Sequence, residues 1–500
     1  MTANEEQQPR AEAWELQAEV QQLRAEVQQR RQIEEQLRQE NAALRVKLDE
    51  LTAEILKLTT QVGELTAKLS KDSSNSSKPP SSDPPWRNKR TRGPRKGGRK
   101  AGGQPGHKPN NRQMLEPTRE EDCRPANCSG CGAELDDSTV VPGMTHVHQT
   151  VNFRILREVT NFHMEQCKCL HCGEKTRAHV GMGTGVPASN FGPNVHATAL
   201  MLIGEYHLSR EEAARFFKDQ CGIHISVGAL QSMVDRAAAA LRPASEGILQ
   251  AIIESNAKHC DETGWRQNNE RAWLWVAAND LAAYFHIDPE RSRAAFSRLL
   301  PEIKGLIHTD RYSAYVHLHA KWHQFCHAHL RRDNQSLIDV GGSVGKLGEA
   351  LQAASNDMFS LWHRYVDDKI DRDELITTME PIKDRVRALA EQATGHEHRK
   401  VKAMGKSLLK HWDSLWCFVE VEGGKPTNNL AERALRPAVI KRRKNGGTRS
   451  ELGAEFLSRK MTVVATAKRN GINLPQWLAS VFEKWWDSAS LPLLLPASTA

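Results

Sequence analysis

A heptad repeat at the start of the chain constrains its fold more than any other feature of the sequence. Within residues 13–69, leucine recurs at seven-residue intervals, and a second apolar residue usually follows four positions later. The first set is Leu16, Leu23, Leu37, Leu44, Leu51, Leu58 and Leu65, and the second set is Val20, Val27, Leu48, Ile55, Val62 and Leu69. In a coiled coil these are the d and a positions, and β-branched residues at a with leucine at d favour a parallel dimer. We therefore predict that residues 1–70 form a parallel coiled coil that makes the chain a homodimer or a higher oligomer.

Three polar residues interrupt this repeat: Arg30 at d, and Glu34 and Asn41 at a. A single Asn at an a position fixes the register and the number of partners. The alternative to a coiled coil is a lone amphipathic helix packed on the body of the protein. A helix of this length is a rod of roughly 85 Å at about 1.5 Å per residue, far longer than a small domain can cover. The repeat therefore favours self-association.

A strongly basic segment follows, and we treat residues 71–115 as a disordered arm. Its Ser, Pro, Gly, Lys and Arg residues cannot bury enough apolar surface to offset the entropy of ordering. Residues 78–112 carry eleven Lys or Arg and one acid, a net charge of +10, whereas the whole chain carries +8. Such an arm can bind DNA phosphates and enter a minor groove, although it could also be a linker that only aids solubility. The candidate DNA-binding residues of the arm are Arg87, Lys89, Arg90, Arg92, Arg95, Lys96, Arg99 and Lys100.

Two Cys-x2-Cys-Gly motifs predict a zinc module over residues 116–185. Cys128 and Cys131 form the first motif, and Cys169 and Cys172 form the second. Four thiolates hold one Zn²⁺ tetrahedrally and leave no open position, so the predicted zinc is structural. Residues 139–166, between the motifs, alternate apolar and polar side chains as a small sheet would.

Within residues 186–248, the sequence predicts helices at 193–208, 209–220 and 226–241. Ser209 and Ser226 are placed as N-caps of the second and third helices, and Gly222 is placed at a helix end. This spacing fits a helix-turn-helix, whose second helix would enter a major groove. The alternative is a plain helical bundle between two domains, because the third helix offers few side chains suited to reading bases.

The remaining chain alternates strands and helices as a mixed α/β domain does. Strands are predicted at 256–260, 271–279, 282–288, 305–310 and 321–326, and helices at 291–303 and 327–337. A ribonuclease-H-like α/β fold has three strands first, followed by a helix, a strand, a helix and a strand. We assign this core to residues 249–340 and 416–470, a helical insertion to 341–415, and a C-terminal helix and tail to 471–500.

Three acids stand where this fold could bring them together. Asp261 follows the first strand and is expected to open a turn, Asp310 follows the fourth strand, and Glu432 lies on a later helix. Most acids in a chain of this size are solvated charges or helix caps. Three convergent carboxylates, however, suit a pair of Mg²⁺ ions, because hard cations prefer oxygen ligands. We therefore predict a catalytic two-metal site at Asp261, Asp310 and Glu432.

The motifs around these acids carry a family resemblance. The segments HCDETGWR, HTDRYSAY, FCHAHLRRD and NNLAERALRPAVIKRRKNGG resemble those of the insertion-sequence 66 family of DDE transposases. NSSKPPSSD, GGQPGH, the paired cysteine motifs and the heptad start resemble the N-terminal half of that family. The resemblance covers nearly the whole chain. It implies a ribonuclease-H-like core with Asp261, Asp310 and Glu432 at the DDE positions, and transposon-end binding by the N-terminal region.

This reading implies a DNA transposase that cleaves transposon ends and joins the freed 3′-hydroxyl to target DNA. Its partners would be double-stranded DNA, at the ends and the target, and candidate helper proteins of the same element. The segment 433–449 holds seven Lys or Arg and no acid. The residues expected to hold DNA phosphates are Arg436, Lys441, Arg442, Arg443 and Lys444. The alternative is that they form only an exposed basic helix face. Two rival classes are a non-catalytic DNA-binding regulator and a nuclease that cuts without joining.

The composition of the chain predicts its location in the cell. The chain starts with an acidic, glutamine-rich stretch without an apolar core, so no signal peptide is expected. No apolar run approaches the ~20 residues that span a bilayer. We expect a cytoplasmic bacterial protein, associated with the nucleoid and without a membrane partner.

Overall fold

The computed structural model describes residues 8–69, 71, 75–76, 113–141, 143, 146–181, 186–187, 189–486, 490–492 and 494–495. Helices and sheets both contribute to it, which confirms the predicted mixed α/β class. The chain forms two compact units: residues 1–83, 237–477 and 491–500 make up the first, and residues 84–236 and 478–490 the second. All the candidate DNA-binding residues of the basic arm, from Arg87 to Lys100, lie outside the described residues.

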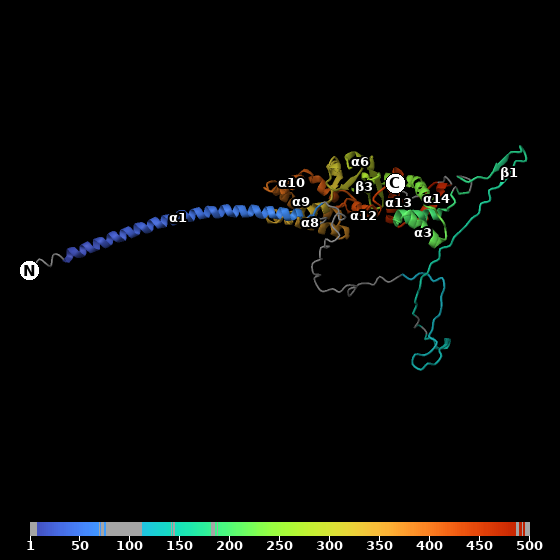
Figure 1. Cartoon of the computed structure of the whole chain (residues 1–500), viewed down its shortest axis with the longest axis horizontal. Coiled ribbons are helices and arrows are strands. Elements are labelled where there is room, and N and C mark those ends of the chain that lie inside the picture. Colours follow the sequence, from blue (N-terminus) through green and yellow to red (C-terminus); the bar gives the residue numbers. More distant parts are fainter. Residues whose placement is uncertain are drawn as a thin grey trace, which may run out of the picture. The chain divides into compact units, whose positions relative to one another are not determined.

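The heptad region is helical. Helix α1 (Gln8–Leu69) is one continuous, gently curved helix, drawn in blue in Figure 1. The heptad side chains from Val20 onward face solvent in this single chain; Leu44 and Ile55, for example, are each 63% exposed. The helix predicted from the sequence is therefore confirmed, whereas its pairing with a second copy stays a prediction.

In the second unit, the helical segments lie near their predicted positions. They are α2 (Pro193–Leu200), the π-helical segment η3 (Met201–Glu205), α3 (Arg210–Cys221) and α4 (Val227–Ala240), the last of which continues into the first unit. The Ser209 hydroxyl accepts from the Glu212 amide (3.1 Å), and the Glu212 carboxylate accepts from the Ser209 amide (2.6 Å). This capping box satisfies two amides that would otherwise lack partners. Gly222 ends α3 at φ 64°, and the Ser226 hydroxyl accepts from the Ala229 amide, so all three predicted cap positions are confirmed.

The small sheet expected at 139–166 is absent from the described residues of that segment, which hold only the 3-10 turn η2 (Asp137–Thr139) and the start of a hairpin. That hairpin consists of β1 (Gln166–Lys168) and β2 (Lys175–Arg177), which flank the second cysteine motif. The alternating apolar side chains stay exposed, and Phe153 and Leu156 are 79% and 87% exposed. Alternation alone was misleading because a strand is stable only when it has a ladder partner and a face to bury.

A five-stranded sheet forms the centre of the first unit. Its strands are β3 (Ala257–Gln267), β4 (Glu270–Ala278), β5 (Ala283–Asp288), β6 (Leu306–Thr309) and β7 (His323–Phe325). Their spatial order is β5-β4-β3-β6-β7, with β3–β4 and β4–β5 antiparallel and β3–β6 and β6–β7 parallel. Strands β4 to β7 were predicted at nearly these places, whereas β3 extends well beyond its predicted end at Cys260. The connection from β6 to β7 holds only the 3-10 turns η4 (Ser313–Tyr315) and η5 (Ala320–Trp322), so no full helix separates these strands as the expected order required.

Helices cover both faces of this sheet. Helices α12 (Asn429–Asn445) and α13 (Glu451–Arg469) pack on one face, where Leu274, Phe285 and Leu435 share a core. Side chains alternate along a strand, so Trp275 points to the opposite face. There it meets Tyr315, which also packs edge-on against Phe296 of α6 (Arg293–Leu299). Figure 1 shows α12 and α13 near β3, and α5 (Arg242–Glu254) contacts β5 and α13.

The region predicted as a helical insertion is helical throughout. After α7 (His327–Ile338) follow α8 (Gly342–Val366), α9 (Arg372–Thr394), α10 (Arg399–Lys410) and α11 (Trp412–Glu420). These helices have a core of their own, which includes Leu351, Met358 and Met379 and joins the sheet at Phe325. Helix α14 (Leu474–Trp486) ends the regular structure. Among the described residues, no helix is both long and apolar enough to cross a membrane.

Candidate active site

Two of the three predicted acids lie side by side because of strand register. His259 of β3 pairs with His308 of the parallel strand β6. Asp261 and Asp310 are each two residues further along, so they lie on the same side of neighbouring strands. Asp310 directly follows β6, as predicted. Asp261 does not open a turn, however: it lies inside β3, opposite Val276.

The strand continues past Asp261 because it pairs with β4 down to a two-residue turn. Asn268 and Asn269 have φ values of 51° and 64°, the backbone that a tight hairpin needs and that Asn tolerates. The sequence contains this turn as QNNE, several residues after the turn that was expected at Asp261. The prediction of a turn at Asp261 was therefore wrong, and the acid is held by a regular ladder.

The third acid reaches the site from α12. Glu432 lies in the first turn of this helix, which packs on β3 and β4. Asn428, just before the helix, is buried; its side-chain amide donates to the Cys260 carbonyl (2.7 Å) and its backbone amide donates to the Cys326 sulfur (3.1 Å). One residue thus joins the start of α12 to the residue before Asp261 and to the start of α7.

Buried histidines secure the loop before Asn428. The ring of His308 stacks on that of His259, with ring centroids 4.0 Å apart. His308 Nδ1 lies 2.9 Å from the Lys258 carbonyl, and Nε2 lies 2.9 Å from the Lys425 amide, so a neutral ring satisfies both. Burial lowers the pKa of His308 to about 4, which keeps the ring neutral near pH 7. The loop is therefore fastened to the sheet without a charge.

The three acids share one electrostatic environment. Burial raises the pKa of Asp261 well above its usual value, and the charges of Glu262, Asp310 and Glu432 raise it further. Burial likewise raises the pKa of Asp310, although the Tyr312 amide donates to its carboxylate at 2.9 Å. Carboxylates crowded in this way repel one another unless a cation lies between them. The arrangement therefore fits a divalent cation.

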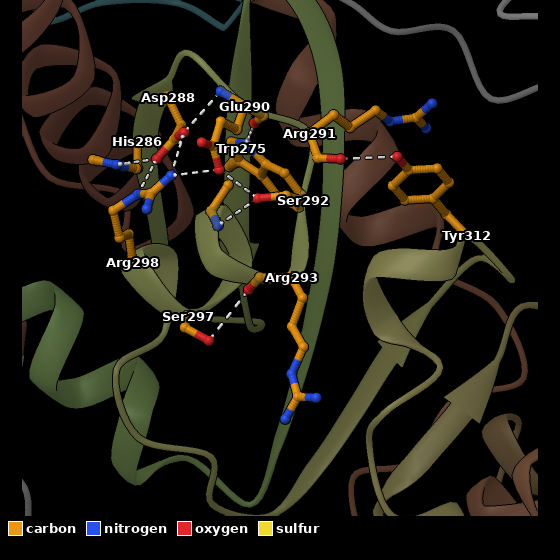
Figure 2. Close-up of polar contacts among 11 residues, drawn as sticks. Trp275, His286, Asp288, Glu290, Arg291, Ser292, Arg293, Ser297, Arg298 and Tyr312 are labelled. Carbon is orange, nitrogen blue, oxygen red and sulfur yellow. Dashed lines mark hydrogen bonds and ion pairs between the residues drawn. The ribbon is translucent and has the colours of Figure 1, made fainter.

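A fourth acid, Glu262, is fully engaged by the protein. Its carboxylate accepts from Arg291 (2.8 Å from Nε) and from the Tyr315 hydroxyl. The Arg291 guanidinium also lies over the Tyr312 ring, 3.7 Å from its centre, and the Tyr312 hydroxyl donates to the Arg291 carbonyl (2.9 Å; Figure 2). These contacts tie the loop after β5 to the loop that carries Asp310. Glu262 is therefore better suited to support than to catalysis.

The loop that carries Arg291 is itself fixed by ion pairs. Asp288, at the end of β5, accepts two hydrogen bonds from Arg298 (2.6 and 2.9 Å) and one from the Glu290 amide (2.9 Å), as Figure 2 shows. The Ser292 hydroxyl accepts from the Ala295 amide and begins α6. Arg291 is thus held in place before any substrate binds.

A cleft of about 500 Å³ opens beside Asp310. Its lining comes from the sheet, from α7 and from the helical insertion, and includes Arg311, Tyr312, His329 and His411. His329 lies beside Glu432, with Nδ1 3.8 Å from Oε1, and Arg332 donates to the same oxygen (3.3 Å). His327, in contrast, is buried and hydrogen-bonds the Leu415 carbonyl, and Trp265 is also part of the core.

The basic residues after Glu432 divide into two groups. Arg436, Arg443 and Lys444 are exposed on α12. Lys441 is buried, and Arg442 donates to the Gly264 carbonyl of β3. The last two therefore contribute to the packing of α12, which sequence reasoning did not foresee.

The two cysteine motifs form matching knuckles. In each knuckle the first cysteine's carbonyl accepts from the glycine amide at 2.9 Å, and Gly132 and Gly173 have φ values of 76° and 77°. Backbone amides lower the pKa of Cys128 and Cys169, which favours the thiolate that a metal requires. Each knuckle brings its own two cysteines together, but the structure does not bring all four predicted zinc ligands into one group.

Comparisons with known proteins identify one described transposase family. Residues 188–456 match the family described as Transposase IS66 family, and residues 3–113 match a family of unknown function. Three proteins of Sinorhizobium fredii, named uncharacterized protein y4hP, y4qI and y4jD, are similar at 25%, 24% and 23% identity. The matches cover 60%, 58% and 76% of this chain and 60%, 59% and 77% of the relatives, so the chain spans about 60% of the length of the first two. Because the family match extends over more than half of the residues and contains all three acids, the chain belongs to the IS66 transposase family.

Proposed function

We propose that this protein cuts DNA at the ends of a mobile element and joins the freed 3′-hydroxyl to target DNA, with Asp261, Asp310 and Glu432 as the catalytic acids. The observation that carries the proposal is the convergence of these acids from β3, β6 and α12, with charges that raise the pKa of Asp261 together. We further infer that the sheet is a ribonuclease-H-like core. The strand order β5-β4-β3-β6-β7 supports this inference, although no full helix separates β6 and β7.

The donor set fits Mg²⁺, because all three groups offer carboxylate oxygens. When bound there, two Mg²⁺ ions would stabilise the attacking and leaving oxygens of phosphoryl transfer. The protein's own part is positioning. The β3–β6 register aligns Asp261 with Asp310, and Asn428 holds the start of α12 against both strands. Glu432 is oriented by Arg332, whose remaining N–H groups can face a phosphate.

DNA would be held by surfaces outside the acids. The exposed Arg436, Arg443 and Lys444 follow Glu432 on one helix, so they can neutralise phosphates that flank the reacting one. We propose that the basic arm and the helices at 193–240 bind the element ends, that Cys128, Cys131, Cys169 and Cys172 hold one structural zinc, and that α1 pairs two copies. Two copies would allow two ends to be processed together.

The experiment is a cleavage and strand-transfer assay with purified full-length protein, candidate element ends, target DNA and Mg²⁺. A transposase cleaves the ends and joins pre-cleaved ends to the target. A hydrolytic nuclease cuts and never joins, and a regulator binds without changing the DNA. Absence of joined product with active, end-binding protein would contradict the proposal.

A further inference from the structure

A second set of ligand-type atoms adjoins the acids. The Cys326 sulfur, a ring nitrogen of His329 and a carboxylate oxygen of Glu432 all lie within 4.8 Å of one another. Among the residues that the structure describes, this is the one group of three or more such side chains. The acids Asp261 and Asp310 are not members of it, so Glu432 stands between two different donor sets.

Local structure explains why these three atoms meet. Cys326 is the N-cap of α7, and His329 follows three residues later, so both side chains lie on the same side of the first turn. Asn428 brings α12 to the same place, because its backbone amide donates to the Cys326 sulfur at 3.1 Å. That amide helps to orient the sulfur. Burial raises the pKa of the Cys326 thiol to about 11, so the thiolate ligand would form when a bound cation displaces the proton.

The histidine is prepared to act as a ligand. His329 Nδ1 is buried and makes no hydrogen bond within the described part of the chain, although it lies 3.8 Å from Glu432 Oε1. A buried ring nitrogen without a partner calls for an explanation. At His329 an ion is one such explanation, because a thiol and a carboxylate lie beside the ring. The cleft of about 500 Å³, which His329 and Asp310 both line, gives an ion a path to the site.

We propose that Cys326, His329 and Glu432 form a binding site for a soft divalent cation, with Zn²⁺ as its preferred ion. Thiolate, imidazole and carboxylate are the ligands of zinc, and three of them leave a fourth position open for water. Mg²⁺ has little affinity for sulfur, so the site separates the two ions by chemistry. Binding would release the Cys326 proton and displace Arg332 from Glu432 Oε1.

The site has a consequence for the DNA chemistry, and this part rests on the proposed function. Glu432 cannot serve Zn²⁺ beside Cys326 and Mg²⁺ beside Asp261 and Asp310 with the same geometry. Zinc bound here therefore withdraws one carboxylate from the Mg²⁺ site. Zn²⁺ in excess of the one proposed structural zinc would therefore inhibit the protein.

The first test measures zinc bound by the full-length protein in equilibrium dialysis. Wild type should bind one more Zn²⁺ per chain than either variant, Cys326→Ser or His329→Gln. This difference does not depend on how much zinc the cysteine knuckles bind. Cys417→Ser is the matched control, because Cys417 is also buried but belongs to no ligand group in the described residues. Equal zinc content in wild type and a folded His329→Gln variant would overturn the proposal, even if Cys326→Ser failed to fold.

The second test measures Mg²⁺-dependent cleavage as Zn²⁺ is added. Half-inhibition should require about tenfold more zinc in His329→Gln than in wild type, as expected for loss of a ligand. An unchanged zinc response would overturn the shared role of Glu432. Dialysis does not require cleavage, so a failure of the proposed DNA chemistry would leave the difference in bound zinc intact.

Discussion

The side-chain amide of Asn428 donates a hydrogen bond of 2.7 Å to the backbone carbonyl of Cys260. Cys260 precedes Asp261 in β3, and Asn428 precedes the helix that carries Glu432. Two acids that are far apart in the sequence are therefore held together by one buried amide.

Asn428→Ala should separate these acids. The Cys260 carbonyl would lose its partner in a buried setting, which costs about 1–3 kcal/mol of unfolding free energy. Cleavage should fall far more than end binding, because the proposed DNA contacts lie elsewhere. Asn470→Ala is the control: Asn470 makes a bond of the same length to the Leu281 carbonyl at the far end of α13. Equal activity of the two variants would show that Asn428 does not position the site.

The proposed coiled coil leads to a prediction about how the chain associates. Leu51→Glu with Leu58→Glu places charges at two d positions and should dissociate the oligomer, as measured by sedimentation velocity. Val46→Glu with Ala53→Glu places the same charges at outward-facing f positions of the same helix and should leave the mass unchanged. If both pairs behave like wild type, α1 is not the site of pairing.

The proposed zinc module leads to a prediction about metal content. Cys169→Ser should remove one Zn²⁺ per chain, because three thiolates hold a structural zinc far more weakly than four. Cys221→Ser, at a cysteine outside both knuckles, should bind as much zinc as wild type. Mass spectrometry of freshly purified protein checks both, and an unchanged zinc content in Cys169→Ser would remove that ligand from the module.

His196 predicts acid sensitivity of the second unit. It is buried against Phe482 and Trp486, and burial, aided by Arg236, lowers its pKa to about 4 from 6.5. Between pH 6.5 and about 4, His196 is therefore protonated in the unfolded chain but stays neutral in the folded chain. Stability from this group is complete above pH 6.5 and falls below it, by about 2 kcal/mol at pH 5. In denaturant titrations at pH 7 and 5, His196→Gln should lose less stability on acidification than wild type, whereas His224→Gln, at an exposed histidine, should not differ.

The sequence was sufficient for features that depend on local chemistry. Ser209, Gly222 and Ser226 were placed at helix ends because capping involves only a few neighbouring residues. The strands were found because they are short apolar runs bounded by turn residues. The extension of β3 through Asp261 was missed, since the polar run DETG is a strand only by virtue of its pairing with β4.

Long-range contacts were beyond reach of the sequence. The docking of α12 places His329 beside Glu432, although the two residues are about a hundred positions apart in the sequence. Arg442 and Lys441 were expected to bind phosphate, yet the fold turns one toward the Gly264 carbonyl and buries the other. Such outcomes depend on how helices pack, which no local pattern encodes.

The central claim is tested most directly by cleavage with Asp261→Asn, Asp310→Asn and Glu432→Gln. Each variant keeps the shape of the side chain and removes one negative charge from the proposed Mg²⁺ site. Mg²⁺-dependent cleavage and strand transfer should fall at least about a thousandfold, because such acids act as a unit. End binding should persist, since the proposed phosphate contacts lie outside the acids. Glu451→Gln, in the first turn of α13 as Glu432 is in that of α12, is the matched control and should stay active. Substantial cleavage by any one of the three folded variants would contradict the assignment of that acid.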